Sequence, residues 1–454
     1  MRIMIITFLT SILTILIIIA FYPLLLQSIL SLKGMKNTYR VDVSEREKRC
    51  GRIFILVPIK RESEDVIESF LKSMMQINSS ISYNLIFIID EDEPKKLLEV
   101  MRRVNFQGDV KILHRPKAKG YKGGALNYAL SNLELKDSDI IIVLDIDSII
   151  TSEFLHKIVE SDFNVLVPKW VVKNEDTVLA RGQKLGYEYF FKFLKGLYKY
   201  TGWIPTLGSG LCIKYSTLKL VNGFPETILE DVELGVRLLI NNVDIKYCED
   251  IYILLEAPSN YYSFTLQQCR WAYGTISIVR RYFKYFLKSW RNFIVLLYLC
   301  QYLAYMTIIP IIIIMYIFCV MDINLNYLTL LIITSFSIFA VTLYILSMYS
   351  TLGKLCLKDL MSINSINMAY ILAIPRMSWS LLLGLSGWSF KWIPTPKGAR
   401  KYSHGVIIEV IYFFIVLTLQ ILSIVKMLLT ITLLTLPLTL CLGRGLYRLL
   451  HGTL

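Results

Sequence analysis

The sequence is poor in the residues that build zinc, haem and disulfide sites. It holds only 4 histidines and 8 cysteines in 454 residues. None of the cysteines forms a C-x-x-C pair or a His/Cys cluster at metal-site spacing. A histidine-based metal centre is therefore not expected. The cysteines are expected to be reduced thiols, buried in a cytosolic domain or facing lipid.

Charged residues are also scarce, at 19%, while hydrophobic residues reach 55%, above the roughly 45–50% of ordinary soluble proteins. The apolar excess lies in residues 3–31 and from Phe293 onward, and residues 32–290 are mixed and long enough to bury a core. The net charge of +14 fits the basic cytoplasmic segments of a membrane protein better than a nucleic-acid surface. It also suits a phosphate-bearing substrate, and no nucleic-acid partner is expected.

Residues 3–31 exceed the ~20 residues that cross a bilayer, and no cleavage site follows them. They predict a membrane anchor bent near Pro23. The basic segment from Lys33 to Arg49 places the chain after it in the cytosol and the amino terminus outside. Further spans are expected at 292–320, 326–348, 406–425 and 428–447.

Residues 361–390 are apolar enough to span, but lysines and arginines flank them on both sides. A crossing would put one basic loop outside, and Pro375-Arg376 interrupts the segment. The pattern favours an amphipathic helix in the cytosolic interface, with a sixth crossing as the alternative. Residues 265–290 mix basic and aromatic residues in the same way and are also expected on the membrane surface.

The segment 32–290 alternates strand and helix patterns. "RIFILVPI", "NLIFIID" and "DIIIVLDID" are typical of strands buried on both faces, and "ESEDVIESFLKSMMQI" has helical spacing. This alternation predicts an α/β fold with a parallel sheet, whose ligands lie at the carboxyl ends of the strands. Pro58 to Glu62, Asp90, Asp145 and Asp147 occupy such ends.

Four short motifs carry candidate chemistry. Asp145-Ile-Asp147 can bind a hard divalent cation, although acidic pairs also occur in ordinary turns. "KGYKGGALN", with Lys122, and "GSGLCIK", with Gly208 and Ser209, allow close approach to a phosphate or sugar, or are plain loops. Glu230-Asp231 begins an amphipathic helix, where acidic residues are also common without any function.

A fifth motif, Gln267-x-x-Arg270-Trp271, follows these four along the chain. In this order the motifs resemble those of the family 2 membrane glycosyltransferases, the type that includes cellulose, chitin and hyaluronan synthases. "WIPTPKG" is similar to the gating loop of cellulose synthases, with Thr395 and Lys397 in register, but with Trp for Phe and Pro for Val. The resemblance implies a GT-A-like cytosolic domain, a Rossmann-type mixed α/β sheet, joined to an α-helical transmembrane region.

The resemblance also implies roles for the motif residues. Asp147 would bind Mg²⁺ or Mn²⁺, and Asp231 would be the general base. Arg270 would hold the leaving diphosphate and Trp271 the terminal acceptor sugar. The remaining implied substrate-binding residues are Pro58, Glu62 and Asp90 around the nucleotide, and Lys122, Asp145, Gly208, Ser209, Glu230, Gln267, Thr395 and Lys397. Leu229 stands where cellulose synthases have Thr, which leaves the sugar open.

Three parts are expected: an anchor at 1–31, a glycosyltransferase domain at 32–290 that ends in an interfacial helix, and a membrane region at 291–454 with a gating-like loop at 391–401. The first functional hypothesis is a processive enzyme that elongates and exports a β-linked polysaccharide. The alternative adds a single sugar to a membrane lipid. A transporter or scaffold is disfavoured because the apolar runs are almost free of charge. UDP-glucose, UDP-N-acetylglucosamine and GDP-mannose remain open as donors.

Overall fold

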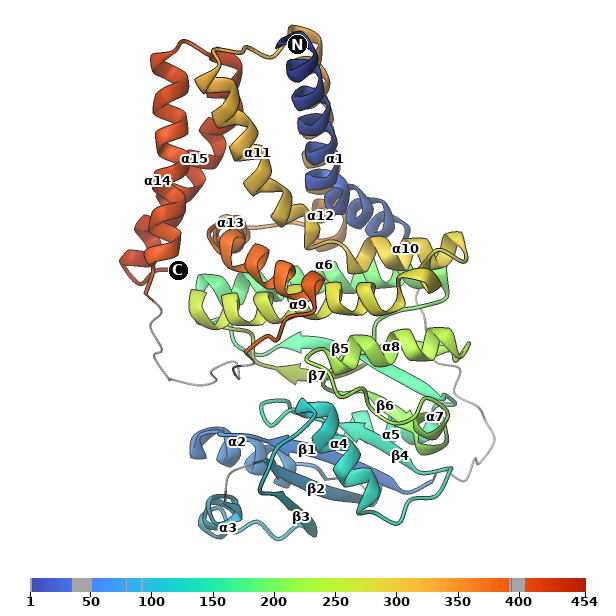
Figure 1. The fold of residues 1–454 in the computed structure, drawn as a ribbon. Helices are drawn as coiled ribbons and strands as arrows, with labels where there is room; N and C mark the ends of the chain where they lie inside the picture. Colours follow the sequence, from blue (N-terminus) through green and yellow to red (C-terminus); the bar gives the residue numbers. More distant parts are fainter. Residues whose placement is uncertain (1, 35–50, 79, 91–92, 392, 394–404) are drawn as a thin grey trace.

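The computed structural model describes residues 2–34, 51–78, 80–90, 93–391, 393 and 405–454 (Figure 1). An α/β domain lies at the bottom of the view, and long apolar helices lie at the top. Between them, α6 (Val178–Thr201) and α9 (Tyr261–Phe286) run across the molecule as an intermediate layer. This layer is therefore shared by the two parts.

One mixed sheet of seven strands, in the order β3-β2-β1-β4-β6-β5-β7, forms the α/β domain. The strands β3, β2, β1 and β4 pair with one another in parallel, as the alternating pattern predicts, and β5 pairs with β7 in parallel. The three-residue strand β6 runs antiparallel to both β4 and β5, which makes the sheet mixed. The strands are β1 (Ile53–Ile59), β2 (Tyr83–Asp90), β3 (Val110–Arg115), β4 (Ile140–Val143), β5 (Val165–Val172), β6 (Cys212–Lys214) and β7 (Ile245–Leu255).

Apolar side chains alternate along β1 between two cores. Ile55 packs with the helices α2 (Glu64–Met75), α3 (Pro94–Arg103) and α5 (Ser152–Glu160). Leu56 faces the other core, which contains α4 (Tyr121–Ser131), α7 (Tyr215–Leu220) and α8 (Glu230–Ile240). This second core continues through α6 and α9 into the apolar helices. The sheet and the membrane helices therefore share one packed interior, which positions them relative to each other.

Six described helices are long and apolar enough to cross a membrane, by length and composition. They are α1 (Arg2–Gly34), in which Pro23 lies and which bends in Figure 1, α11 (Leu303–Val320), α12 (Tyr327–Leu352), α13 (Leu357–Ser386), α14 (Ile407–Val425) and α15 (Leu429–Leu450). This is the pattern of a multi-pass membrane protein.

The expected continuous span over 292–320 is divided in the structure. A short helix, α10 (Trp290–Leu299), ends before α11 begins. Polar side chains hold the turn between them: Gln301 Oε1 accepts a hydrogen bond from Gln27 (3.2 Å), and the Tyr302 hydroxyl donates to Gln268 (2.7 Å). These two bonds connect the turn to α1 and α9.

The helix α13 covers most of residues 361–390, for which the sequence favours a position in the membrane interface over a crossing. It qualifies as a span by composition, but 56% of its most apolar window is buried, against at most 39% in the other five. It packs against α6 and α9, and Figure 1 shows it beside α9. Its placement in the membrane interface remains a prediction, which this packing supports.

The contact between α1 and α6 is unusually close. A Cβ added at Gly196 would lie 1.9 Å from the carbonyl oxygen of Leu30, and one added at Gly34 would lie 2.1 Å from that of Lys192. Only glycine permits such an approach of two helix backbones. The end of α1 is thereby fixed on the layer that covers the α/β domain.

We predict that Gly196→Ala lowers the thermal unfolding temperature of the detergent-solubilised protein by at least about 2 °C, because overpacking costs roughly 1–3 kcal/mol. The matched control is Gly186→Ala in the same helix, where an added Cβ meets nothing within 4 Å. This control should unfold at or slightly above the wild-type temperature, because alanine favours helix. Equal melting of both variants and the wild type would contradict the close contact.

Candidate active site

A cavity of about 980 Å³ opens at the carboxyl ends of β1, β2 and β4, and residues of α6 and α9 form part of its wall. Every predicted site residue within the described ranges lines it: Pro58, Glu62, Asp90, Lys122, Asp145, Asp147, Gly208, Ser209, Glu230, Asp231, Gln267, Arg270 and Trp271. Thr395 and Lys397 lie outside the described residues. Residues from seven separate regions of the chain therefore meet in one space.

Lys122 is the central cation of the cavity. Its Nζ lies 2.7 Å from Asp145 Oδ1, 2.6 Å from the carbonyl oxygen of Gly208 and 3.8 Å from Glu230 Oε1. Burial lowers the pKa of Lys122, but the charges of Asp145 and Glu230 outweigh this effect and raise it overall. The ammonium group is therefore retained and ties α4 to the end of β4, to the Gly208 loop and to α8.

Glycine and serine in the Gly208-Ser209 loop allow it to approach the acidic groups. A Cβ at Gly208 would lie 2.9 Å from Asp231 Oδ2. The Ser209 hydroxyl accepts from the Asp145 amide at 3.0 Å and donates to the Ser148 hydroxyl at 2.7 Å. The loop therefore fixes the backbone at the start of the Asp145-Ile-Asp147 motif.

The two neighbouring carboxylates Glu230 and Asp231 begin α8 inside the cavity. Burial and then the charge of Asp231 raise the pKa of Glu230 to about 8. Burial also raises the pKa of Asp231, although Lys122, the Val232 amide and Arg270 oppose that effect. The Val232 amide donates to Asp231 Oδ1 at 2.8 Å. Glu230 is thus the member of the pair that holds a proton more readily.

A buried glutamate one turn along α8 fixes this helix against α9. Glu233 is 1% exposed and forms an ion pair with Arg281, and it accepts from the Tyr282 hydroxyl at 3.0 Å. Leu229, the residue before the acidic pair, lies against Gly274 of α9. A Cβ added at Gly274 would lie 2.5 Å from the Cβ of Leu229. These contacts set the distance between the acidic pair and the Gln267–Trp271 motif.

Gln267, Arg270 and Trp271 face the cavity from α9. The charge of Arg270 acts on Asp231 and on Tyr187. The Thr275 hydroxyl donates to the carbonyl oxygen of Trp271 at 2.9 Å. The motif therefore presents a cation and an aromatic ring to the same space as the acidic pair.

Asp90, at the end of β2, is held in a two-point ion pair. Arg115 Nε donates to one carboxylate oxygen and Arg115 Nη2 to the other, both at 2.6 Å, and both side chains are less than 10% exposed. This geometry is that of a strong, oriented guanidinium–carboxylate pair. Sequence reasoning did not identify Arg115.

Comparison with known proteins agrees with this architecture. Residues 140–442, more than half of the chain, match the family described as Glycosyl transferase family group 2, and residues 54–213 match Glycosyl transferase family 2. The chain belongs to the family 2 glycosyltransferases.

Among the curated relatives of this family 2 chain, a probable glycosyltransferase of Sulfolobus acidocaldarius is 30% identical over 55% of this chain and 56% of its own length. Glucomannan 4-beta-mannosyltransferase 1 of Cyamopsis tetragonoloba is 21% identical over 52% of this chain and 47% of its own. The chain thus spans about half the length of these relatives. A solved mannosyltransferase of Pyrobaculum calidifontis, in complex with GDP-Man and Mn²⁺, aligns over 82% of this chain and 99% of its own at 15% identity, with a TM-score of 0.55. It shows that the fold is GT-A-like.

The donor set of the cavity suits a divalent metal held jointly with a diphosphate. Among the described residues, no group of three histidine, cysteine or acidic side chains forms a complete metal cage. Mg²⁺, however, is commonly bound by one or two carboxylates together with substrate phosphates. Asp145 and Asp147 line the cavity, and acidic side chains outnumber basic ones along its wall. A diphosphate entering this acidic space requires added positive charge, so the residues present fit such a metal.

Outside the motifs, three aromatic side chains of the cavity were not identified from the sequence: Trp170, Tyr187 and Phe390. They come from β5, from α6 and from the segment after α13. In a chain that is 13% aromatic, no local pattern distinguishes them from core residues. Only the tertiary structure places them beside the motif residues.

The raised pKa of Glu230 predicts how the metal-free protein responds to pH. Because the folded state binds this proton more tightly than the unfolded state, stability is lost as pH rises from the ordinary glutamate range towards about 8. In EDTA, the unfolding temperature of the wild type should fall between pH 5.5 and 8 by a few degrees more than that of Glu230→Gln. Parallel curves for the two proteins would exclude this assignment.

Proposed function

We propose that this family 2 chain is an inverting hexosyltransferase that moves a sugar from a nucleotide-sugar donor to an acceptor hydroxyl at the cytosolic membrane surface. The observation that carries the proposal is that Asp145, Asp147, Asp231 and Arg270 line one cavity. These are the groups that a metal-bound diphosphate and a nucleophilic hydroxyl require together. The catalytic domain is taken as residues 32–290, between the anchor at 1–31 and the membrane region at 291–454.

The donor would lie across the carboxyl ends of the strands, with its nucleotide near Pro58, Glu62 and Asp90. Lys122 holds Asp145 in place at 2.7 Å, and Asp147 would bind Mg²⁺ or Mn²⁺. Such a metal supplies positive charge that neutralises the leaving diphosphate. Gly208 and Ser209 would line the space for the sugar, where the missing side chain of Gly208 leaves room beside Asp231.

Asp231 would act as the general base. It accepts the proton of the acceptor hydroxyl while that oxygen forms a bond to the anomeric carbon and the bond from this carbon to the diphosphate oxygen breaks. A single displacement inverts the anomeric configuration. Arg270 stabilises the departing diphosphate, so no acid is required to protonate it. Trp271 offers an aromatic face to the terminal acceptor sugar, and Gln267 and Glu230 complete the site.

The comparisons support a mannosyl donor as one candidate. The relatives include a glucomannan mannosyltransferase, and the aligned structure contains GDP-Man and Mn²⁺. GDP-mannose therefore joins UDP-glucose and UDP-N-acetylglucosamine as a leading candidate. A growing β-linked polysaccharide is the first candidate acceptor, and the glucomannan relatives support it.

A membrane lipid is the second candidate acceptor, because packed tyrosines lie directly behind the motif helix. Tyr302 is 6% exposed and hydrogen-bonds Gln268, beside Gln267 of the motif. Tyr305 and Tyr370 stack with ring centroids 5.5 Å apart, between α11 and α13. An exported chain that left between α9, α11 and α13 would have to displace these rings.

The first test incubates the purified protein, reconstituted in lipid nanodiscs, with each radiolabelled donor and Mn²⁺, Mg²⁺ or EDTA. We expect label to be transferred from one donor, and EDTA to remove activity that Mn²⁺ restores. Separation by size distinguishes the acceptors: a long product indicates a polysaccharide, and a lipid-sized product indicates single addition. No nucleoside diphosphate release from any donor would refute the proposal.

The second test replaces the base. Asp231→Asn should lower transfer about 10²–10⁴-fold, while donor binding, measured by titration calorimetry, stays within a few-fold of wild type. The side chain keeps its size, so folding should be retained. The control, Asp250→Asn on β7, changes a carboxylate that does not line the cavity and should leave transfer unchanged. An active Asp231→Asn enzyme would refute the base assignment.

A further inference from the structure

Tyr187 lines the cavity from α6, in the layer between the sheet and the apolar helices. Its ring meets the Trp170 ring edge-on, with centroids 5.9 Å apart. Trp170 is itself held, because its Nε1 donates to the carbonyl oxygen of Ser209 at 2.8 Å. The Tyr187 ring therefore rests against a residue that is tied to the Gly208-Ser209 loop.

The Tyr187 hydroxyl is surrounded by groups of the proposed site. It forms a hydrogen bond with the Gln267 side chain, and the charges of Arg270 and Asp147 act on it. Burial is the main effect and raises the pKa of Tyr187 to about 12. At neutral pH the group is thus a neutral hydroxyl that can donate a hydrogen bond.

A chain of hydrogen bonds orients the partner of this hydroxyl. The Tyr302 hydroxyl donates to Gln268 Oε1 at 2.7 Å, and Gln268 Nε2 donates to Gln267 Oε1 at 3.5 Å. The Gln267 hydrogen bond lowers the pKa of Tyr187, as a bond donated to the phenol oxygen does, so we take the Gln267 NH₂ group as the donor. The phenol oxygen then accepts, and its own proton remains for a group in the cavity.

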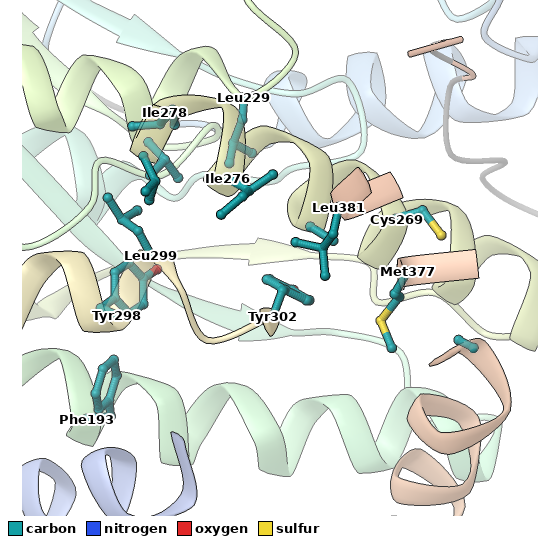
Figure 2. Packing of buried hydrophobic residues seen from close by; sticks show 14 of the residues in the cluster. Phe193, Leu229, Cys269, Ile276, Ile278, Tyr298, Leu299, Tyr302, Met377 and Leu381 are labelled. Atoms are coloured by element: carbon teal, nitrogen blue, oxygen red, sulfur yellow. The ribbon is translucent and has the colours of Figure 1, made fainter. Parts of the chain in front are cut away.

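Tyr302 anchors this chain of bonds in the packed interior. Figure 2 shows Tyr302 and Leu299 inserted between α9, which carries Ile276, and α6, which carries Phe193. Nearby, Tyr298 stacks on Phe193 with centroids 5.7 Å apart. The series of hydrogen bonds therefore ends on a well-packed residue, and the geometry of these bonds is fixed before any ligand binds.

We infer that Tyr187 is an acceptor-binding residue whose hydroxyl donates to an oxygen of the incoming glycosyl acceptor beside Trp271. The inference rests on the proposed function. An anionic diphosphate is served by Lys122 and Arg270, whereas a neutral donor suits a sugar hydroxyl. The residues assigned to the nucleotide come from β1 and β2, while Tyr187 belongs to α6, in the layer that also carries Trp271.

The test compares Tyr187→Phe with Tyr189→Phe. Tyr189 lies two residues along the same helix and is buried, but its hydroxyl is bonded to Ser347 at 2.7 Å, outside the cavity. Both variants lose one phenol hydroxyl from α6. Nucleoside diphosphate release is measured with the donor and metal that the wild type uses, without acceptor and with β-1,4-mannobiose or octyl β-glucoside as the acceptor probe.

We expect Tyr187→Phe to lower acceptor-dependent transfer more than it changes the donor KM or the hydrolysis of donor in the absence of acceptor. Its kcat/KM for the acceptor probe should fall about 3- to 30-fold, as expected for one lost hydrogen bond to a polar ligand. Tyr189→Phe should match the wild type in both assays. A general loss of structure would instead lower hydrolysis and transfer together.

Three results would overturn the inference. A rise in donor KM together with equal losses of hydrolysis and transfer would make Tyr187 a diphosphate contact. An unchanged kcat/KM for the probe would show that the hydroxyl does not touch the acceptor. If the wild type releases nucleoside diphosphate but neither probe increases that release, the assignment of a glycosyl acceptor is refuted, while the donor chemistry is not. Absence of release from every donor removes the proposed function itself.

Discussion

The arrangement of the cavity depends on one half-buried cation, Lys122. Lys122 reaches Asp145, the carbonyl oxygen of Gly208 and Glu230, and each of these belongs to a different element. Without it, the carboxylates of Asp145, which follows β4, and Glu230, on α8, would face one another with no cation between them, and like charges repel. Because 39% of the Asp145 side chain and 19% of the Lys122 side chain are exposed, solvent screens part of the attraction between these two groups. The ammonium group therefore fixes the positions of the acidic groups before any donor or metal binds.

The other half of the site belongs to the layer between the two parts of the molecule. The ion pair of Glu233 with Arg281 fixes α8 against α9, and the Gly34–Gly196 contact fixes α1 on α6. Because the same apolar core continues from the sheet into the long helices, Arg270 and Trp271 cannot shift without moving that core. The site is thus assembled from the sheet on one side and from the membrane-side layer on the other, which places the chemistry where these two parts meet.

The sequence predicted the features that short-range patterns determine. Continuous β-branched runs identify the strands β1, β2 and β4, and the residues that follow such runs lie at one edge of the sheet. Hence Pro58, Asp90, Asp145 and Asp147 could be placed in one cleft in advance. The direction of β6 could not be predicted, because a strand of three residues carries no sequence signal for its orientation. The turn between α10 and α11 depends on Gln27 and Gln268, distant partners that local hydropathy does not register. Tyr187 and Trp170 were missed for the same reason, and Thr395 and Lys397 remain predictions.

The two ends of the cavity differ in how their charges are balanced, and this difference follows the chemistry of a nucleotide sugar. At the end of β2, Arg115 engages both oxygens of Asp90, so the pair offers oriented acceptor lone pairs with no net charge, which is suited to the edge of an uncharged base. Towards α9, Arg270 acts on Asp231, and the acidic residues gather around Lys122. Charge is therefore concentrated where a diphosphate and a metal would lie and is neutralised where the base would lie. This distribution of charge is compatible with the proposed nucleotide-sugar donor, whose charge is concentrated on its diphosphate.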